Sequence, residues 1–214
     1  SLQKYLLSLG VAASPLIGRG ERMKYINQVS QPEGICLSAS YSQYLTPTCL
    51  KEMHRMKVIC FGDSNTYGYD PRGYFGGRYE SGCRWVDILA AETGWDIYNM
   101  GQNGREIPSA APVFPVDTDL LIVMLGTNDL LQGRSLEQAT ERLEWFLVGI
   151  SLDRSKILLI TPPPVTLGAW VPNPQLIEDS RTFAQLCQVL AERLGIRFAD
   201  AGKWDIPLAY DGVH

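Results

Sequence analysis

The sequence lacks several features that would place it in a large functional class. No apolar run reaches the roughly 20 residues that a membrane span requires. The five cysteines include no CxxC pair and have no histidine at metal-ligand spacing, which argues against a zinc site. Their odd number and wide spacing predict reduced, mostly buried thiols rather than a disulfide framework; they are Cys36, Cys49, Cys60, Cys83 and Cys187.

Two further absences concern charge and catalytic motifs. The chain has no excess of positive charge, because its 214 residues have a net charge of -4, so neither nucleic acid nor an anionic membrane is the expected partner. No GxSxG pentapeptide occurs, which argues against the nucleophile-elbow type of hydrolase. Only two histidines are present, His54 and His214. A neutral or weakly polar small molecule is the expected ligand.

Charge divides the chain near residue 55. Residues 1–55 contain six Lys or Arg and three Asp or Glu, whereas residues 56–214 contain thirteen and twenty. We therefore expect an N-terminal extension over 1–55 and one domain over 56–214. The extension has a helix-like apolar face over Leu2–Leu9. Its run from Tyr5 to Ile17 resembles a signal sequence, so secretion is the alternative to the expected cytoplasmic location.

From residue 56 onward, apolar strands alternate with amphipathic helices. Such alternation predicts a three-layer α/β/α sandwich around a central parallel sheet of about five strands. The expected strands are 57–61, 95–100, 119–125, 156–160 and 196–200, and the expected helices are 84–93, 135–149 and 175–194. In a parallel sheet, sites form beyond the carboxyl ends of the strands.

Four polar motifs lie after these expected strands: GDSN (62–65), MGQNG (100–104), GTND (126–129) and DGVH (211–214). A serine hydroxyl needs a base to accept its proton, and the base needs a group that holds its tautomer. Ser64 is the candidate nucleophile, and His214 is the only histidine inside the expected domain. Asp211, three residues earlier, can accept the proton on the other imidazole nitrogen. The motifs therefore predict a Ser64–His214–Asp211 triad.

Acyl transfer also places negative charge on the former carbonyl oxygen, which requires hydrogen-bond donors. The backbone N–H groups of Ser64 and Gly101 and the side-chain amide of Asn128 are the candidates. Asp63 and Asp129 are expected to anchor turns rather than to react. A metal-dependent phosphohydrolase that uses Asp63, Asp129 and Asp211 is a weaker alternative.

The ordered set Gly62-Asp63-Ser64, Gly101, Gly126-x-Asn128-Asp129 and Asp211-x-x-His214 resembles the SGNH, or GDSL-type, hydrolase family. This resemblance covers about Met56 to His214. It implies a flavodoxin-like SGNH hydrolase fold, Ser64 as nucleophile, Gly101 and Asn128 as oxyanion donors, and Asp211 with His214 as the rest of the triad. The segments CRWVDILA, LLIVMLGTND and TPPPV are similar to the arylesterase and acyltransferase branch, whose members act on short acyl esters and often oligomerise.

The expected activity is hydrolysis of a small carboxylic ester, short-acyl or aryl, through an acyl-enzyme and without metal or organic cofactor. The partner is then a small-molecule ester, and a homo-oligomer is compatible with the resemblance. Carbohydrate deacetylation or acyl transfer to an alcohol would use the same catalytic groups. A non-catalytic domain that binds an ester-bearing ligand is the alternative of another class.

Two further expectations concern the surroundings of the site. The loop from Tyr67 to Arg84 is rich in Tyr and Arg and can line an acyl or aromatic pocket, with Trp170 as a second wall. Members of the family generally continue past the histidine into a helix, whereas this sequence ends at His214. We expect the Leu2–Leu9 helix to pack where that helix would lie.

Overall fold

The computed structural model describes residues 55–73, 77–204 and 206–214. The expected extension, including the Leu2–Leu9 helix and the Tyr5–Ile17 run, lies outside these residues, so the division at residue 55 stays a prediction.

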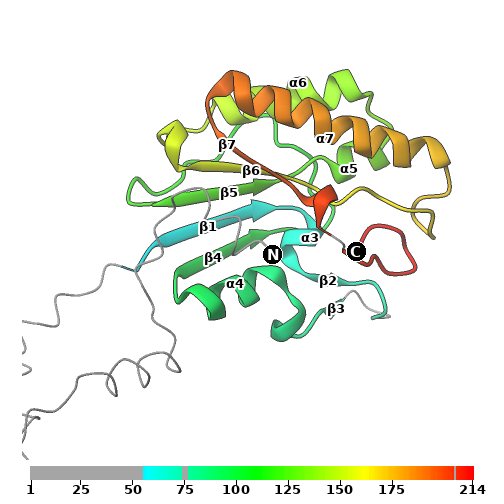
Figure 1. The fold of residues 1–214 in the computed structure, drawn as a ribbon, viewed down its shortest axis with the longest axis horizontal. Helices are drawn as coiled ribbons and strands as arrows, with labels where there is room; N and C mark the ends of the chain where they lie inside the picture. The colour runs from blue at the N-terminus through cyan, green and yellow to red at the C-terminus, as the bar shows by residue number, and fades with distance from the viewer. Residues whose placement is uncertain (1–54, 74–76, 205) are drawn as a thin grey trace, which may run out of the picture.

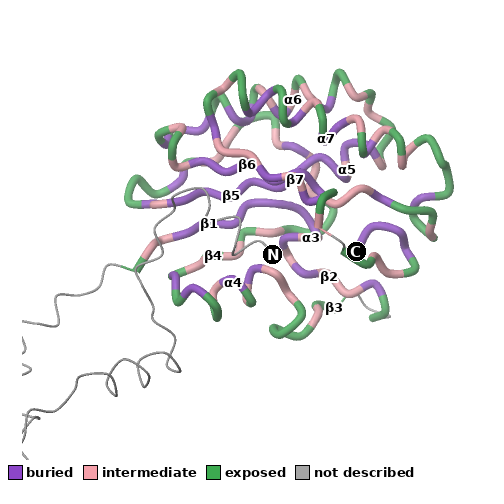
Figure 2. The backbone as a smooth tube through the Cα atoms, in the orientation of Figure 1, coloured by how far each residue is buried: buried purple, intermediate pink, exposed green. Residues whose placement is uncertain are grey.

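Five parallel strands form the centre of the molecule in the order β4-β1-β5-β6-β7 (Figure 1). The predicted three-layer α/β/α architecture is therefore confirmed, and each predicted strand is present within one or two residues of its expected bounds. The strands are β1 (Lys57–Gly62), β4 (Asp96–Gly101), β5 (Leu120–Met124), β6 (Ile157–Thr161) and β7 (Arg197–Asp200). The central strands consist almost entirely of buried residues (Figure 2), as a sheet covered on both faces requires.

Helices cover both faces of this sheet. Figure 1 shows α6 (Leu136–Val148) and α7 (Pro174–Leu194) on one face and α4 (Trp85–Thr93) on the other. The first face packs Ile59, Leu121 and Val123 against Leu143 and Phe183 of these helices. Alternate residues of the same strands point to the opposite face, where they pack with α4. Period-two alternation thus divides the core into two apolar layers.

The helix ends follow the sequence signals. Ser135 and Gln138 form a capping box at the start of α6, where the sequence predicted a helix over 135–149. Helix α7 begins after Asn173, which caps it, and ends at Gly195 in the left-handed conformation. Among the described residues, no helix combines the length and apolar character that crossing a membrane requires.

The structure also contains elements that the sequence did not predict. Two short helices, α3 (Ser64–Tyr67) and α5 (Thr127–Leu131), begin within the motifs that follow β1 and β5. The segment read as a loop from Tyr67 to Arg84 contains an antiparallel pair, β2 (Tyr69–Asp70) and β3 (Gly77–Arg78), and a 3-10 turn, η2 (Ser81–Cys83). Two further 3-10 turns are η3 (Arg154–Lys156) and η4 (Ala201–Lys203). Isolated two-residue strands leave no periodic pattern, which explains why they were missed.

Candidate active site

Asp211 and His214 form a tightly bonded pair in the C-terminal segment. His214 Nδ1 lies 2.6 Å from Asp211 Oδ2, and both side chains are almost completely buried. Asp211 Oδ1 accepts from the backbone N–H groups of Val213 and His214. Burial alone would raise the pKa of Asp211, but the hydrogen bonds from the His214 ring and from these two N–H groups outweigh it and lower the pKa. The carboxylate is therefore ionised and orients the imidazole.

The turn that carries this pair is held by the segment after β6. Thr166 N–H donates to Gly212 O, and Trp170 N–H donates to Asp211 O. Gly212 adopts a φ of 81°, and a Cβ there would lie 2.2 Å from Thr166 O, so only glycine permits this close approach. The backbone of His214 is thus fixed by hydrogen bonds to Asp211 and Ala209.

Ser64 is the first residue of α3, directly after β1, and its side chain is buried. Asp63 caps this helix by accepting from Asn65 N–H at 2.9 Å. The N–H of Ser64 belongs to the first turn of the helix and needs no intrahelical acceptor. The side chain of Asn99, in β4, donates to Thr66 O, and Trp85 Nε1 donates to Asn65 O. Ser64 therefore lies on a short helix that is fixed from two sides.

The environment of Asp63 is unusual for a carboxyl group. Its side chain has no exposed surface. Burial raises the pKa of Asp63 to about 7, although hydrogen bonds from the N–H of Asn65 and the hydroxyl of Thr127 and the charge of Arg105 oppose this rise. Asp63 acts as a helix cap, which agrees with its predicted role as an anchor.

Asn128 lies in the first turn of α5 and is half-buried. Its Nδ2 donates to Arg105 O at 3.1 Å, which uses one of its two hydrogens and leaves the other available. Asp129 accepts from Ile107 N–H and faces Arg134 and Arg142, so it anchors the segment after β4, as expected. These two contacts place the segment that follows Gly104 beside Asn128.

The backbone N–H of Gly101, the expected oxyanion donor from β4, already makes a hydrogen bond in this structure. Its N–H donates to Asn99 Oδ1 at 2.9 Å. A Cβ at this position would lie 2.1 Å from the backbone N of Tyr67, so close packing of α3 on β4 explains the glycine. Gly104 differs, because it is exposed with a φ of 70°, and its N–H makes no hydrogen bond within the described residues. The spacing of the MGQNG motif did not distinguish the two glycines.

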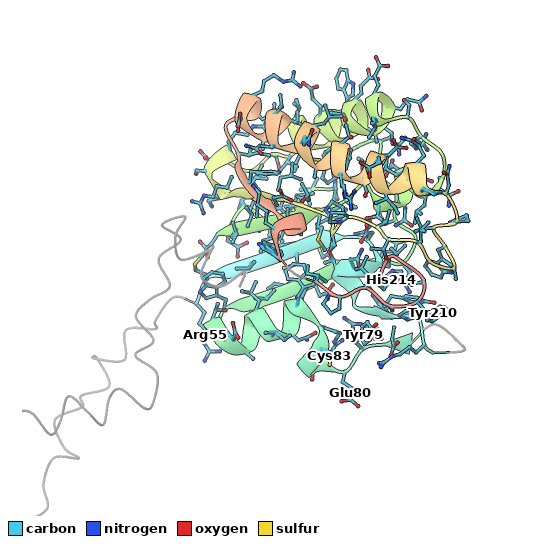
Figure 3. All side chains as sticks on the ribbon, turned by 45° about the vertical axis from the view of Figure 1, so that its right-hand side comes forward. Arg55, Tyr79, Glu80, Cys83, Tyr210 and His214 are labelled. Atoms are coloured by element: carbon cyan, nitrogen blue, oxygen red, sulfur yellow. The ribbon has the colours of Figure 1, made fainter. Side chains whose placement is uncertain are left out.

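A cavity of about 490 Å³ lies beside His214, on the sheet face that carries α4. Aromatic side chains contribute much of its lining, and its two arginines are each paired with an aspartate, Arg72 with Asp70 and Arg84 with Asp87. The predicted pocket wall from the Tyr67–Arg84 segment supplies several of these residues. Figure 3 labels Tyr79 and Cys83 on that segment and His214 on the C-terminal segment. The lining includes Asn65, Tyr69, Tyr79, Cys83, Trp85, Trp204 and His214.

His214 Nε2 is buried and has no hydrogen-bond partner among the described residues, so it does not bond to Ser64 Oγ in this structure. The nitrogen is therefore free to accept a proton. Within the described part of the chain, no three His, Cys, Asp or Glu side chains form a metal-binding group. The three aspartates of the phosphohydrolase alternative have separate contacts: Asp63 with Asn65, Asp129 with Ile107 and Asp211 with His214.

A family model described as GDSL-like lipase/acylhydrolase matches residues 60–214. The chain belongs to this family. The family includes the SGNH hydrolases to which the sequence motifs pointed, so the predicted membership is confirmed, and with it the assignment to the esterases and hydrolases. No match was found among curated proteins.

Solved structures with the same fold include three esterase-type relatives of this GDSL-like hydrolase. A carbohydrate acetylesterase family member from Sinorhizobium meliloti is 26% identical, with a TM-score of 0.61 over 74% of this chain and 89% of the other. A protein described as a candidate arylesterase from Agrobacterium tumefaciens str. C58 is 29% identical over the same shares, also with a TM-score of 0.61. The aryl esterase of M. smegmatis, 23% identical over 75% of this chain and 90% of the other with a TM-score of 0.61, shows likeness of fold alone.

Proposed function

We propose that this GDSL-like hydrolase is a serine esterase that cleaves small carboxylic esters with an aryl or short acyl group. The observation that carries the proposal is the buried Asp211–His214 pair, whose Nε2 has no hydrogen-bond partner among the described residues and whose histidine lines an apolar cavity. Ser64 begins the helix whose next residue, Asn65, lines the same cavity.

In this mechanism His214 Nε2 takes the proton of Ser64 Oγ as the oxygen attacks the ester carbonyl carbon. The resulting imidazolium is stabilised by Asp211 and returns the proton to the departing alcohol. Water, deprotonated by the same nitrogen, then attacks the acyl-enzyme and releases the acid, and the proton returns to Ser64. Asp211 holds the imidazole in the tautomer with the proton on Nδ1.

The oxyanion of the tetrahedral intermediate requires donors near Ser64. We assign this role to the N–H of Ser64 and to the second hydrogen of Asn128 Nδ2. Gly101 would have to release Asn99 Oδ1 before it could act as a third donor. The N–H of Gly104 is the alternative in the same segment, because it is free among the described residues and adjoins Arg105, whose carbonyl contacts Asn128.

The cavity supports an aryl or other apolar substituent on the ester. A volume of about 490 Å³ lies within the usual range of ligand pockets and exceeds what an acetyl group needs. The paired arginines provide no free positive charge, which disfavours anionic substrates. The likeness to a carbohydrate acetylesterase family member makes sugar acetates the second candidate substrate class.

The experiment that tests the proposal is active-site titration with a fluorophosphonate. The wild-type protein should incorporate one label at Ser64, the Ser64→Ala variant should incorporate none, and the exposed control Ser151→Ala should behave as wild type. Failure of the wild type to react would favour the alternative of a non-catalytic ligand-binding domain.

A panel of nitrophenyl esters, phenyl esters and acetylated sugars then separates the substrate classes. We expect kcat/KM for aryl and butyryl esters to equal or exceed that for acetyl esters. A preference restricted to acetylated sugars would contradict the assignment of the cavity. Product analysis in the presence of a primary alcohol measures the ratio of transfer to hydrolysis.

A further inference from the structure

The ring of His214 contacts two aromatic rings that come from other segments. Its centroid lies 4.8 Å from that of Tyr69, in β2, at an interplanar angle of 57°. The ring of Trp170, which precedes α7, lies 5.3 Å away and is nearly perpendicular at 88°. Tyr69 and Trp170 also contact each other, with centroids 5.7 Å apart. Three rings from distant parts of the sequence therefore pack as one group.

The hydrogen bond to Asp211 fixes only one atom of the imidazole. It holds Nδ1 but leaves the ring able to tilt about that contact, and such a tilt moves Nε2, the atom that must accept the proton. Rings packed at two different angles restrict this tilt, because rotation would bring the imidazole into contact with one or the other. Tyr69 and Trp170 thus supply the constraint that Asp211 does not.

Trp170 is far more exposed than the imidazole that it contacts. The His214 side chain is 2% exposed, whereas Trp170 is 47% exposed. Trp170 is not among the residues that line the cavity, so the prediction that it forms a second wall was wrong, whereas Tyr69 does line the cavity.

We propose that Tyr69 and Trp170 are positioning residues that hold the plane of the His214 ring for proton transfer. This inference rests on the proposed function of His214 as the base. It assigns to the segment between β6 and α7 a role in the rate of the reaction rather than in substrate binding.

Trp170 is the residue to test, because it does not itself line the cavity. Trp170→Leu should lower kcat for a nitrophenyl ester by roughly 2- to 13-fold, the range that one aromatic pair corresponds to. KM should stay within twofold. Trp170→Phe, which keeps an aromatic ring, should recover most of the lost rate. Trp145→Leu, at an exposed position of α6, is the matched control and should leave both constants unchanged.

A second measurement separates positioning from general destabilisation. The proton on Nδ1 that is shared with Asp211 gives a far-downfield NMR signal when the imidazole is held. This signal should be sharp in the wild type and in Trp170→Phe and broadened in Trp170→Leu, with the thermal midpoint of each variant measured in parallel.

Unchanged kcat in Trp170→Leu would overturn the proposal, and so would a loss confined to KM. An equally sharp NMR signal in Trp170→Leu would also overturn it. These outcomes can be distinguished from failure of the proposed function. In that case fluorophosphonate would leave Ser64 of the wild type unlabelled, whereas the NMR comparison needs no catalytic activity.

Discussion

At the scale of single residues, the polar side chains of the candidate site are oriented by hydrogen bonds other than those that the proposed reaction uses. Asp211 bonds the imidazole through one oxygen and the backbone of its own turn through the other. Asn128 donates one hydrogen to Arg105 O and keeps one for an oxyanion. Each group is thereby oriented before a substrate arrives, which is the condition for electrostatic stabilisation of a transition state.

The first residue-scale prediction concerns Asn128. Asn128→Ala should lower kcat by roughly 10²- to 10³-fold, because a single oxyanion donor contributes that much in related chemistry. Steady-state kinetics on a nitrophenyl ester measures the effect. Asn103→Ala, at a nearby exposed position, is the control and should retain wild-type kcat. A loss below threefold in Asn128→Ala would remove this side chain from the mechanism.

The second residue-scale prediction concerns how Asp63 makes the stability of the protein depend on pH. Its folded pKa of about 7 lies above the ordinary 3.8, so the folded protein keeps a proton that the unfolded chain releases between these values. Stability from this group is therefore fully present below pH 3.8 and is lost as pH rises through 7. Asp63→Asn keeps the cap but cannot ionise. Its thermal midpoint relative to wild type should increase from pH 5 to pH 8, and a difference independent of pH would contradict the assigned burial.

At the scale of elements, sequence signals gave helix ends well and short elements poorly. The bounds of α6 and α7 lie within one residue of the expected ones, because capping by Ser135 with Gln138 and by Gly195 is a local interaction. The helix α3 has only four residues and depends on Asn99 and Trp85, which are distant in sequence. Asn99 was not predicted as part of the site, and its position two residues before Gly101 was the available signal.

The element-scale prediction concerns Ser135, the N-cap of α6. Ser135→Ala removes an acceptor for the N–H of Gln138 and should lower the free energy of unfolding by about 1 kcal/mol. Urea unfolding measures this change, with Ser151→Ala as a control that should not differ from wild type. Activity per folded molecule should be unchanged, since α6 does not line the cavity.

At the scale of the whole molecule, the two apolar layers on opposite faces of the sheet differ in whether they adjoin the cavity. The layer beneath α6 and α7 is tightly packed and includes stacked rings of Phe61 and Phe146. The layer beneath α4 adjoins the cavity, to which Met124 and Ile160 contribute. The cavity of the proposed site thus adjoins the layer beneath α4 and not the layer beneath α6 and α7.

This division gives the prediction at the largest scale. Leu143→Ala, in the layer beneath α6 and α7, should lower the free energy of unfolding by roughly 2–5 kcal/mol, because it leaves a cavity in a packed core. Val189→Ala on the exposed face of α7 should change it little. Both variants should keep wild-type KM, and a raised KM in Leu143→Ala would show that the layers are coupled.

The sequence by itself determined the order of strands and helices and the helix caps, because hydrophobic period and capping are properties of neighbouring residues. It also placed Ser64 and Asn128 after strands whose carboxyl ends share one edge of the sheet, and Asp211 and His214 in the segment that follows the last strand. Only the tertiary structure decided that Gly101 donates to Asn99, that Asp63 is completely buried, and that Tyr69 and Trp170 contact the imidazole. These features depend on contacts between segments far apart in the chain, and local patterns carry no record of such contacts.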